Sequence, residues 1–323
     1  MPIHNLGYRE WEGDRESGSS RWKVVAGIGI RRAWQSMWLR RIAFVVWAPP
    51  LVYAVLIFVF EQFLGKQSGI HPRDFGRGLE LFLPAEAAPG VLMVLNNVDS
   101  ATSQELLTVV RPVFWKAVLL QLQRSQCIGM VFVIGLVAPP LISQDVRSRA
   151  FLLYFSRPLT RLQYIIGKFS TVAAFLLLTT TLPQLLLYLF AVLLSPDISV
   201  IAYTWDLPLR AIAASLIMII PTSLLALMLS SLTVETRFAT FGWFSIWIFG
   251  LGAFLVMQRL SGETSELILH LSFLYLLFGD LSAKILGIPM LTSHFEVEFA
   301  FVIALSVICF AVIFHRVSAP LRA

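Results

Sequence analysis

Long apolar runs recur along this chain from Ile42 to Phe314, and few charged residues interrupt them. A helix crosses the hydrocarbon core of a bilayer, about 30 Å thick, with roughly 20 apolar residues. Only 14% of the residues are charged, whereas an ordinary soluble domain has about a quarter. So little charge cannot cover a soluble globule with polar surface. We therefore expect one all-α polytopic membrane domain with short polar connections.

Six of these runs are long enough to cross a bilayer. Arg124 shortens the second run, because a helix from Arg124 to Ile142 already rises about 27 Å. We therefore expect Arg124 at a membrane–water interface, and we expect the segment before it to lie outside the hydrocarbon core. We expect residues 1–23 to form a polar cytoplasmic leader, since they lack the apolar core of a secretory signal, and residues 24–323 to form the membrane domain. The expected spans are approximately 42–64, 124–142, 165–194, 209–232, 238–257 and 297–314.

A seventh apolar region, residues 267–291, is broken by polar residues. Its apolar run Leu267–Gly279 is too short to span, and Asp280 and Lys284 follow it at helical spacing. We expect a buried or interfacial hairpin, because irregular backbone at membrane depth persists only against protein or water. If the region crossed the bilayer, the chain would have seven spans, with an ion pair of Asp280 and Lys284 near the middle of one.

The distribution of Lys and Arg predicts the topology. With six spans, sixteen of the 25 basic residues fall on the side that holds both termini and six fall on the opposite side. Cytoplasmic loops carry the excess of Lys and Arg in membrane proteins. We therefore expect a multi-pass protein of the inner (cytoplasmic) cell membrane with both termini in the cytoplasm.

The segment Gly27–Arg41 has the pattern of one amphipathic helix. Ile30 and Ala33 share a face with the Trp residues, and the Arg residues lie on the other face. Such a helix lies in the membrane interface, where it can act as a lever or simply orient the first span. The expected membrane-interface residues are Arg31, Arg32, Trp34, Trp38 and Arg40.

The segment Ser143–Lys168 is cytoplasmic by the charge rule but too apolar for a solvated loop. Its apolar group, residues Phe151–Phe155, is flanked on both sides by Arg residues. An apolar patch with a basic rim is typical of a protein contact site. A basic helix that rests on lipid is the alternative. Pro158 suits the first turn of a helix that leads into the third span.

This segment resembles one known family. The order of an acidic residue (Asp145), a basic turn, Leu152–Arg161 and then Tyr164–Lys168 is similar to the segment that joins spans two and three of ABC-2 type permeases. The layout is also similar: an interfacial helix, six spans and a broken hairpin before the last span. The long loop 65–112 and the polar leader depart from the pattern.

The resemblance implies a permease subunit of an ATP-driven exporter. The segment between spans two and three would be a coupling helix that docks into a separate ATPase subunit. Two ATPase copies would act on this chain and on a second copy of it, or on a related permease. The residues that the resemblance assigns to the ATPase contact are Asp145, Arg147, Arg149, Phe151, Tyr154, Phe155, Arg157 and Arg161.

Absent motifs agree with a non-enzymatic subunit. The chain has no G-x-x-x-x-G-K-[ST] motif, so ATP and Mg²⁺ would bind to the partner and this chain would need no cofactor. No basic run lies in exposed polar sequence, so we expect no nucleic-acid partner. The five histidines are scattered, and Cys127 and Cys309 lie in apolar stretches. We therefore expect no metal site.

Polar residues within the spans bear on the alternatives. Glu61 lies near the outer end of the first span, where we expect it to be solvated, and no series of carboxylates appears at mid-depth. This weakens an ion-coupled secondary transporter, while a non-transporting scaffold for a cytoplasmic complex stays open. The other polar positions are Gln121, Gln123 and Gln126 before the second span, and Thr179–Thr181 and Gln184 beside Pro183 in the third.

Overall fold

A computed structural model describes residues 20–65, 103–150, 159–195, 198–260, 266–288 and 294–318. Within these ranges the chain is helical and has no strand, which confirms the all-α fold class. The helices are α1 (Arg21–Trp34), α2 (Met37–Val46), α3 (Ala48–Gly65), α6 (Ser103–Val137), α7 (Pro139–Arg147), α9 (Arg161–Leu176), the π-helix η2 (Leu177–Thr181), α10 (Leu182–Leu194), α11 (Val200–Thr204), α12 (Asp206–Leu232), α13 (Thr236–Leu260), α14 (Glu266–Ser272), α15 (Leu274–Leu286) and α16 (Phe295–Ser318).

Among the described residues, six helical stretches are long and apolar enough to cross a membrane, so the polytopic class is confirmed too. Each expected span overlaps one of them. The second stretch differs most from expectation, because α6 starts at Ser103 and passes Arg124 without a break. The six stretches are Met37–Gln62, Arg111–Arg147, Arg161–Leu194, Val200–Leu232, Thr236–Arg259 and Phe295–Val317.

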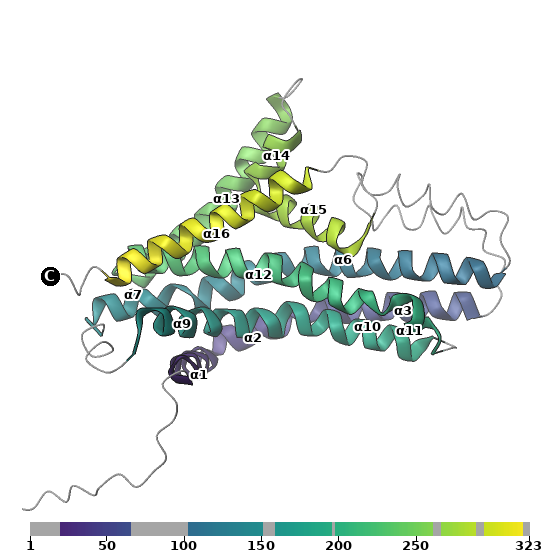
Figure 1. The fold of residues 1–323 in the computed structure, drawn as a ribbon, viewed down its shortest axis with the longest axis horizontal. Coiled ribbons are helices and arrows are strands. Elements are labelled where there is room, and N and C mark those ends of the chain that lie inside the picture. The colour runs from purple at the N-terminus through teal and green to yellow at the C-terminus, as the bar shows by residue number, and fades with distance from the viewer. Residues whose placement is uncertain are drawn as a thin grey trace, which may run out of the picture.

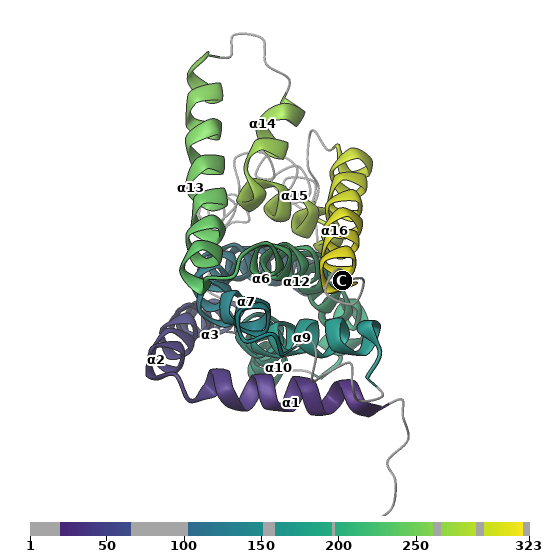
Figure 2. The same cartoon turned by 90° about the vertical axis from the view of Figure 1, so that its left-hand side faces the viewer.

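Four of the stretches form an elongated bundle. α3, α6, α9 with α10, and α12 run side by side along the long axis, whereas α13 and α16 diverge on one side with α14 and α15 between them (Figures 1 and 2). One apolar core lies where α6, α7, α9 and α12 meet, and a second lies where α3, α6 and α10 meet. The indole of Trp243 is fully buried and donates to the carbonyl of Val131, which ties the base of α13 to α6.

The N-terminal amphipathic segment forms two helices rather than the expected single helix. α1 ends at Trp34, and α2 starts at Met37 with a new orientation. Ser36 breaks the helix: its backbone is extended and its hydroxyl accepts from the amide of Leu39, as an N-cap residue does. Trp38 therefore belongs to α2 and is exposed, while the Trp34 ring stacks on Phe175 with centroids 5.9 Å apart.

α1 lies across the bundle axis and packs on α9 (Figure 2). A glycine makes this close approach possible. A Cβ atom at Gly167 would lie 2.7 Å from Cβ of Val25 and 2.9 Å from the carbonyl oxygen of Trp22. Any larger residue at position 167 would therefore push α1 away from the bundle.

Prolines within the long stretches lie at helix starts and inside helices. Pro139 starts α7 directly after α6 ends, and Pro183 lies in the first turn of α10, where the missing N–H costs least. Pro221 lies inside α12. The second stretch is thus divided into α6 and α7, whereas the third runs without a break from α9 through η2 into α10.

Gly167→Ala tests the contact of α1 with α9. We expect it to destabilise the protein by about 1–3 kcal/mol, because the backbone of Trp22 must move. Thermal unfolding in detergent measures this. Gly252→Ala is the matched control, since a Cβ there meets nothing within 4 Å, and the same change in an exposed helix stabilises by roughly 0.5–1 kcal/mol. Equal melting temperatures for the two variants would contradict the packing described.

Candidate partner-docking site at the connection of α7 and α9

The C-terminal end of α7 and the N-terminal end of α9 lie at one end of the bundle (Figure 1). The C-terminal end of α16 lies at the same end (Figure 1). Of the residues predicted to contact a partner, Asp145, Arg147, Arg149 and Arg161 are described. The predicted residues Phe151, Tyr154, Phe155 and Arg157 lie outside the described residues, as does Pro158.

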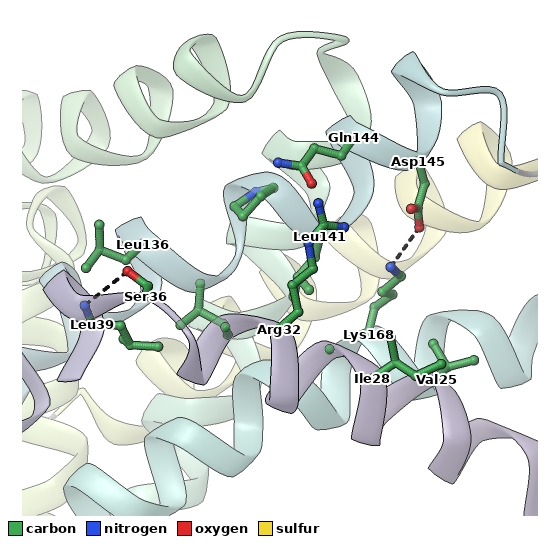
Figure 3. Close-up of a pocket in the computed structure, with 14 residues that line it drawn as sticks. Val25, Ile28, Arg32, Ser36, Leu39, Leu136, Leu141, Gln144, Asp145 and Lys168 are labelled. Atoms are coloured by element: carbon green, nitrogen blue, oxygen red, sulfur yellow. Dashed lines mark hydrogen bonds and ion pairs between the residues drawn. The ribbon is translucent and has the colours of Figure 1, made fainter.

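A buried carboxylate joins the two helices that flank this connection. Asp145 on α7 is 7% exposed, and its Oδ2 lies 2.7 Å from Nζ of Lys168 on α9. The hydroxyl of Tyr164, which is fully buried, donates to the same oxygen at 2.7 Å. The dashed contact in Figure 3 joins Asp145 to Lys168. Asp145 thus faces α9 rather than outward, and its predicted contact with an ATPase subunit stays a prediction.

The burial of Asp145 makes this contact costly to break. A buried charge that loses its partner costs several kcal/mol, because neither water nor another charge compensates it. Here both Lys168 and Tyr164 compensate the carboxylate, and Nζ of Lys168 also lies 5.3 Å from the centre of the Tyr164 ring. The ends of α7 and α9 are therefore fixed to each other independently of the segment that connects them along the chain.

The C-terminus of α7 contains a strained residue. The amide of Ala150 donates to the carbonyl of Asp145, and the amide of Arg149 donates to that of Val146. These two bonds form a Schellman motif, which usually has glycine in its left-handed position. α15 follows that rule with Gly287 at φ 73°, but α7 has Arg149 at φ 51°. A side chain in this conformation costs roughly 1–2 kcal/mol.

Two more arginines frame the connection. Arg147 is exposed, and its Nη1 lies 3.3 Å from Oε2 of Glu235, which follows α12. Arg161 is the first residue of α9 and is partly buried. Thr160 caps that helix together with Gln163 in a capping box. The described helix therefore starts at Arg161, later than the start that Pro158 predicts.

A pocket of about 220 Å³ lies between α1, α7 and α9 (Figure 3). Val25, Ile28 and Leu141 supply apolar walls, and Arg32 and Lys168 supply positive charge. Of the predicted interface residues, only Arg32 lines this pocket. The other four, Arg31, Trp34, Trp38 and Arg40, are exposed.

At the opposite end of the bundle, Glu61 differs from the prediction that it is solvated. Glu61 is 4% exposed rather than solvated. Its Oε1 accepts from Nε of Arg111 at 3.1 Å, and its Oε2 lies 3.0 Å from Nη2 of the same guanidinium. Arg111 also donates to the hydroxyl of Tyr203. This buried pair links α3 to α6 and α11.

The glutamines and threonines noted in the sequence meet inside the bundle. Gln184 of α10 donates to the side chains of Gln123 and Gln126 of α6. Next to them the chain forms the π-helix η2, where Thr179 and Thr180 donate to carbonyls of the preceding turn. A π-turn and hydroxyls that bond back to the backbone both bend a helix, so the third stretch has a built-in irregularity at this polar layer.

A cluster that the sequence did not predict lies between α14, α15 and α16. It brings together His270, Asp280 and Glu298, and Arg124 of α6 lies beside Asp280. Nothing in the sequence signals it, because each residue comes from a different helix. Asp280 contacts His270 and Arg124, while Lys284 is exposed, so the described residues do not show the pair of Asp280 with Lys284 that a chain of seven spans would have.

Asp145→Asn and Lys168→Met test the buried pair. Each single change leaves one polar partner buried, and we expect a loss of about 3–5 kcal/mol in the free energy of unfolding. The double variant should recover at least half of that loss. Arg147→Ala is the control, because it removes an exposed ion pair on the same helix, worth about 0–1 kcal/mol. Additive losses in a double-mutant cycle would contradict a direct contact.

Comparisons with protein families, with curated proteins and with solved structures find no match for this chain. Its function is therefore inferred from its own residues and geometry.

Proposed function

We propose that this chain is the permease subunit of an ATP-driven exporter of the ABC-2 type and that a separate ATPase subunit docks at the connection of α7 and α9. The observation that carries the proposal is the contact between the ends of α7 and α9, the two helices that flank this connection. Asp145 holds the two helix ends together through Lys168 and Tyr164. A partner that moves the connection would therefore move both helices as one body.

The helices that meet there lead directly into the membrane spans. α7 follows α6 after a break at Ala138, and α9 continues through η2 into α10. α1 packs on α9 at Gly167, so it would move with the same body. Protein cores transmit displacements through such packed contacts, and a two-state change needs only different partner contacts in the two states.

Charge supports a cytoplasmic position for this end of the bundle. The exposed arginines Arg147 and Arg149 lie at the α7 terminus, and Arg316 lies in the last turn of α16, whose C-terminal end is at the same end of the bundle (Figure 1). An excess of Lys and Arg marks cytoplasmic segments. We thus propose that both termini face the cytoplasm and that the chain resides in the cytoplasmic membrane.

Arg149 supports a binding role for the connection. Its left-handed backbone would be less strained with glycine, so the arginine lowers stability where it stands. Strained residues persist where the side chain has a use. An exposed guanidinium beside the Arg-flanked apolar segment 151–155 fits a contact with an acidic rim on a partner protein.

The chain would work as part of a larger assembly. It has no P-loop, so ATP and Mg²⁺ would bind to the ATPase. Two ATPase copies that close on ATP need two membrane subunits, and we propose a second copy of this chain or a related permease as the other one. The apolar spans do not identify the exported substrate.

Tyr154→Glu with Phe155→Glu tests the docking site. Two buried carboxylates would oppose an apolar contact, so we expect the tagged full-length variant to lose a P-loop ATPase that co-purifies with the wild-type chain in mild detergent. The loss should exceed tenfold by quantitative mass spectrometry. Intact assembly after the double change would contradict the proposal.

Trp205→Glu is the matched control. Trp205 is an exposed aromatic residue that lies between α11 and α12, at the end of the bundle away from α7 (Figure 1). It should retain the ATPase at the wild-type level. Transport by the isolated chain in proteoliposomes without nucleotide would instead favour a secondary transporter, and a bound partner without transport would favour a scaffold.

Arg149→Gly separates stability from binding. Glycine relieves the left-handed strain, so we expect the melting temperature of the chain to rise, by the equivalent of about 1 kcal/mol. Co-purification of the ATPase should weaken at the same time, because the guanidinium is lost. A variant that is more stable and binds its partner as well as wild type would show that Arg149 has no part in docking.

A further inference from the structure

The cluster of His270, Asp280 and Glu298 goes beyond the proposed exporter function and does not depend on it. His270 lies in the last turn of α14, Asp280 lies in α15 and Glu298 lies in the first turn of α16. One ligating atom from each lies within 4.8 Å of the other two. Nδ1 of His270 is 2.7 Å from Oδ2 of Asp280 and 3.8 Å from Oε1 of Glu298.

The two carboxylates are deeply buried. Asp280 is 5% exposed and Glu298 is 4% exposed, while the side chain of His270 is 15% exposed. A buried carboxylate normally accepts hydrogen bonds that replace those from water. Both oxygens of Asp280 are buried, yet neither accepts a hydrogen bond in the described part of the chain. The close approach of Nδ1 to Oδ2 thus lacks hydrogen-bond geometry, and both oxygens of this buried carboxylate are left without a donor beside the other two side chains of the cluster.

The charge balance of the cluster also favours a bound cation. Arg124 is the only described cation paired with Asp280 besides His270, and its Nη2 lies 3.7 Å from Oδ1. Gly279 leaves room for this guanidinium, since a Cβ there would be 3.0 Å from its Nε. Arg124 balances one of the two carboxylates and contacts the oxygen that is not directed to His270. One negative charge remains when the imidazole is neutral, and burial makes it costly.

We propose that His270, Asp280 and Glu298 form a binding site for a divalent transition-metal ion, with Zn²⁺ or Mn²⁺ as the fitting class. One imidazole nitrogen and two carboxylate oxygens are a ligand set that these ions accept, and a fourth position stays for water. Arg124 would orient the Asp280 carboxylate from outside the ligand set.

Such an ion would have a structural effect on the last two spans. α13 and α16 diverge from the bundle, and α14 and α15 lie between them (Figure 2). The ligands come from α14, α15 and α16, so a bound ion would join the intervening hairpin to the final span. It would thereby stabilise a part of the protein that has less packing around it than the bundle.

Zinc content and thermal stability of the purified full-length chain test the site. The chain should be purified with a tag that lacks histidine, treated with EDTA and supplied with Zn²⁺ or Mn²⁺. We expect about one ion per chain and a rise in melting temperature on adding the ion. His270→Ala and Glu298→Gln should each lower the bound ion to background and abolish the rise.

His315→Ala is the matched control, because His315 is an exposed histidine on the same helix as Glu298. It should bind the ion as wild type does. If His270→Ala does not fold, Glu298→Gln decides, because it keeps the size of the side chain. Two results would overturn the site. The wild-type chain could bind no more ion than the double variant His270→Ala with Glu298→Gln, or His315→Ala could lose as much bound ion as His270→Ala does. The cluster would then be a network of internal ion pairs.

Discussion

The contact of Asp145 with Lys168 and Tyr164 is the interaction on which the end of the bundle that holds α7 depends. A carboxylate and an ammonium are taken out of water together, and a phenol satisfies the same oxygen that the ammonium approaches. The cost of burying either charge alone makes the arrangement cooperative. Because the two charges belong to α7 and α9, the geometry of spans two and three is fixed where they leave the membrane.

The same principle recurs wherever the described helices are joined by polar groups. Glu61 pairs with Arg111 between α3 and α6, and Gln184 meets two glutamines of α6. Apolar packing between helices offers little net gain over packing against lipid, so buried polar contacts specify which helices meet. The cluster around Asp280 does this for the part of the chain that diverges from the bundle.

Hydropathy predicts the six long helices, because the thickness of the bilayer imposes their length and composition. The finer geometry depends on contacts between distant residues. Ser36 splits the amphipathic segment by capping α2, which a helical periodicity does not reveal. Glu61 looks solvated until Arg111 is placed beside it. The cluster of His270, Asp280 and Glu298 joins three helices. Arg149 has a left-handed backbone at a helix end where glycine is the usual residue. The predicted contacts at Phe151, Tyr154, Phe155 and Arg157 stay predictions.

Photo-crosslinking from position 154 tests whether a separate ATPase subunit docks on the segment between α7 and α9. A p-benzoylphenylalanine in place of Tyr154 has a similar size and reacts with whatever lies against it in the living cell. If the ATPase docks there, we expect an adduct with a P-loop ATPase, identified by mass spectrometry. We also expect that adduct to be lost when Phe155 is changed to Glu. Adducts with lipid alone would show that this segment rests on the membrane, and the docking site would then be contradicted.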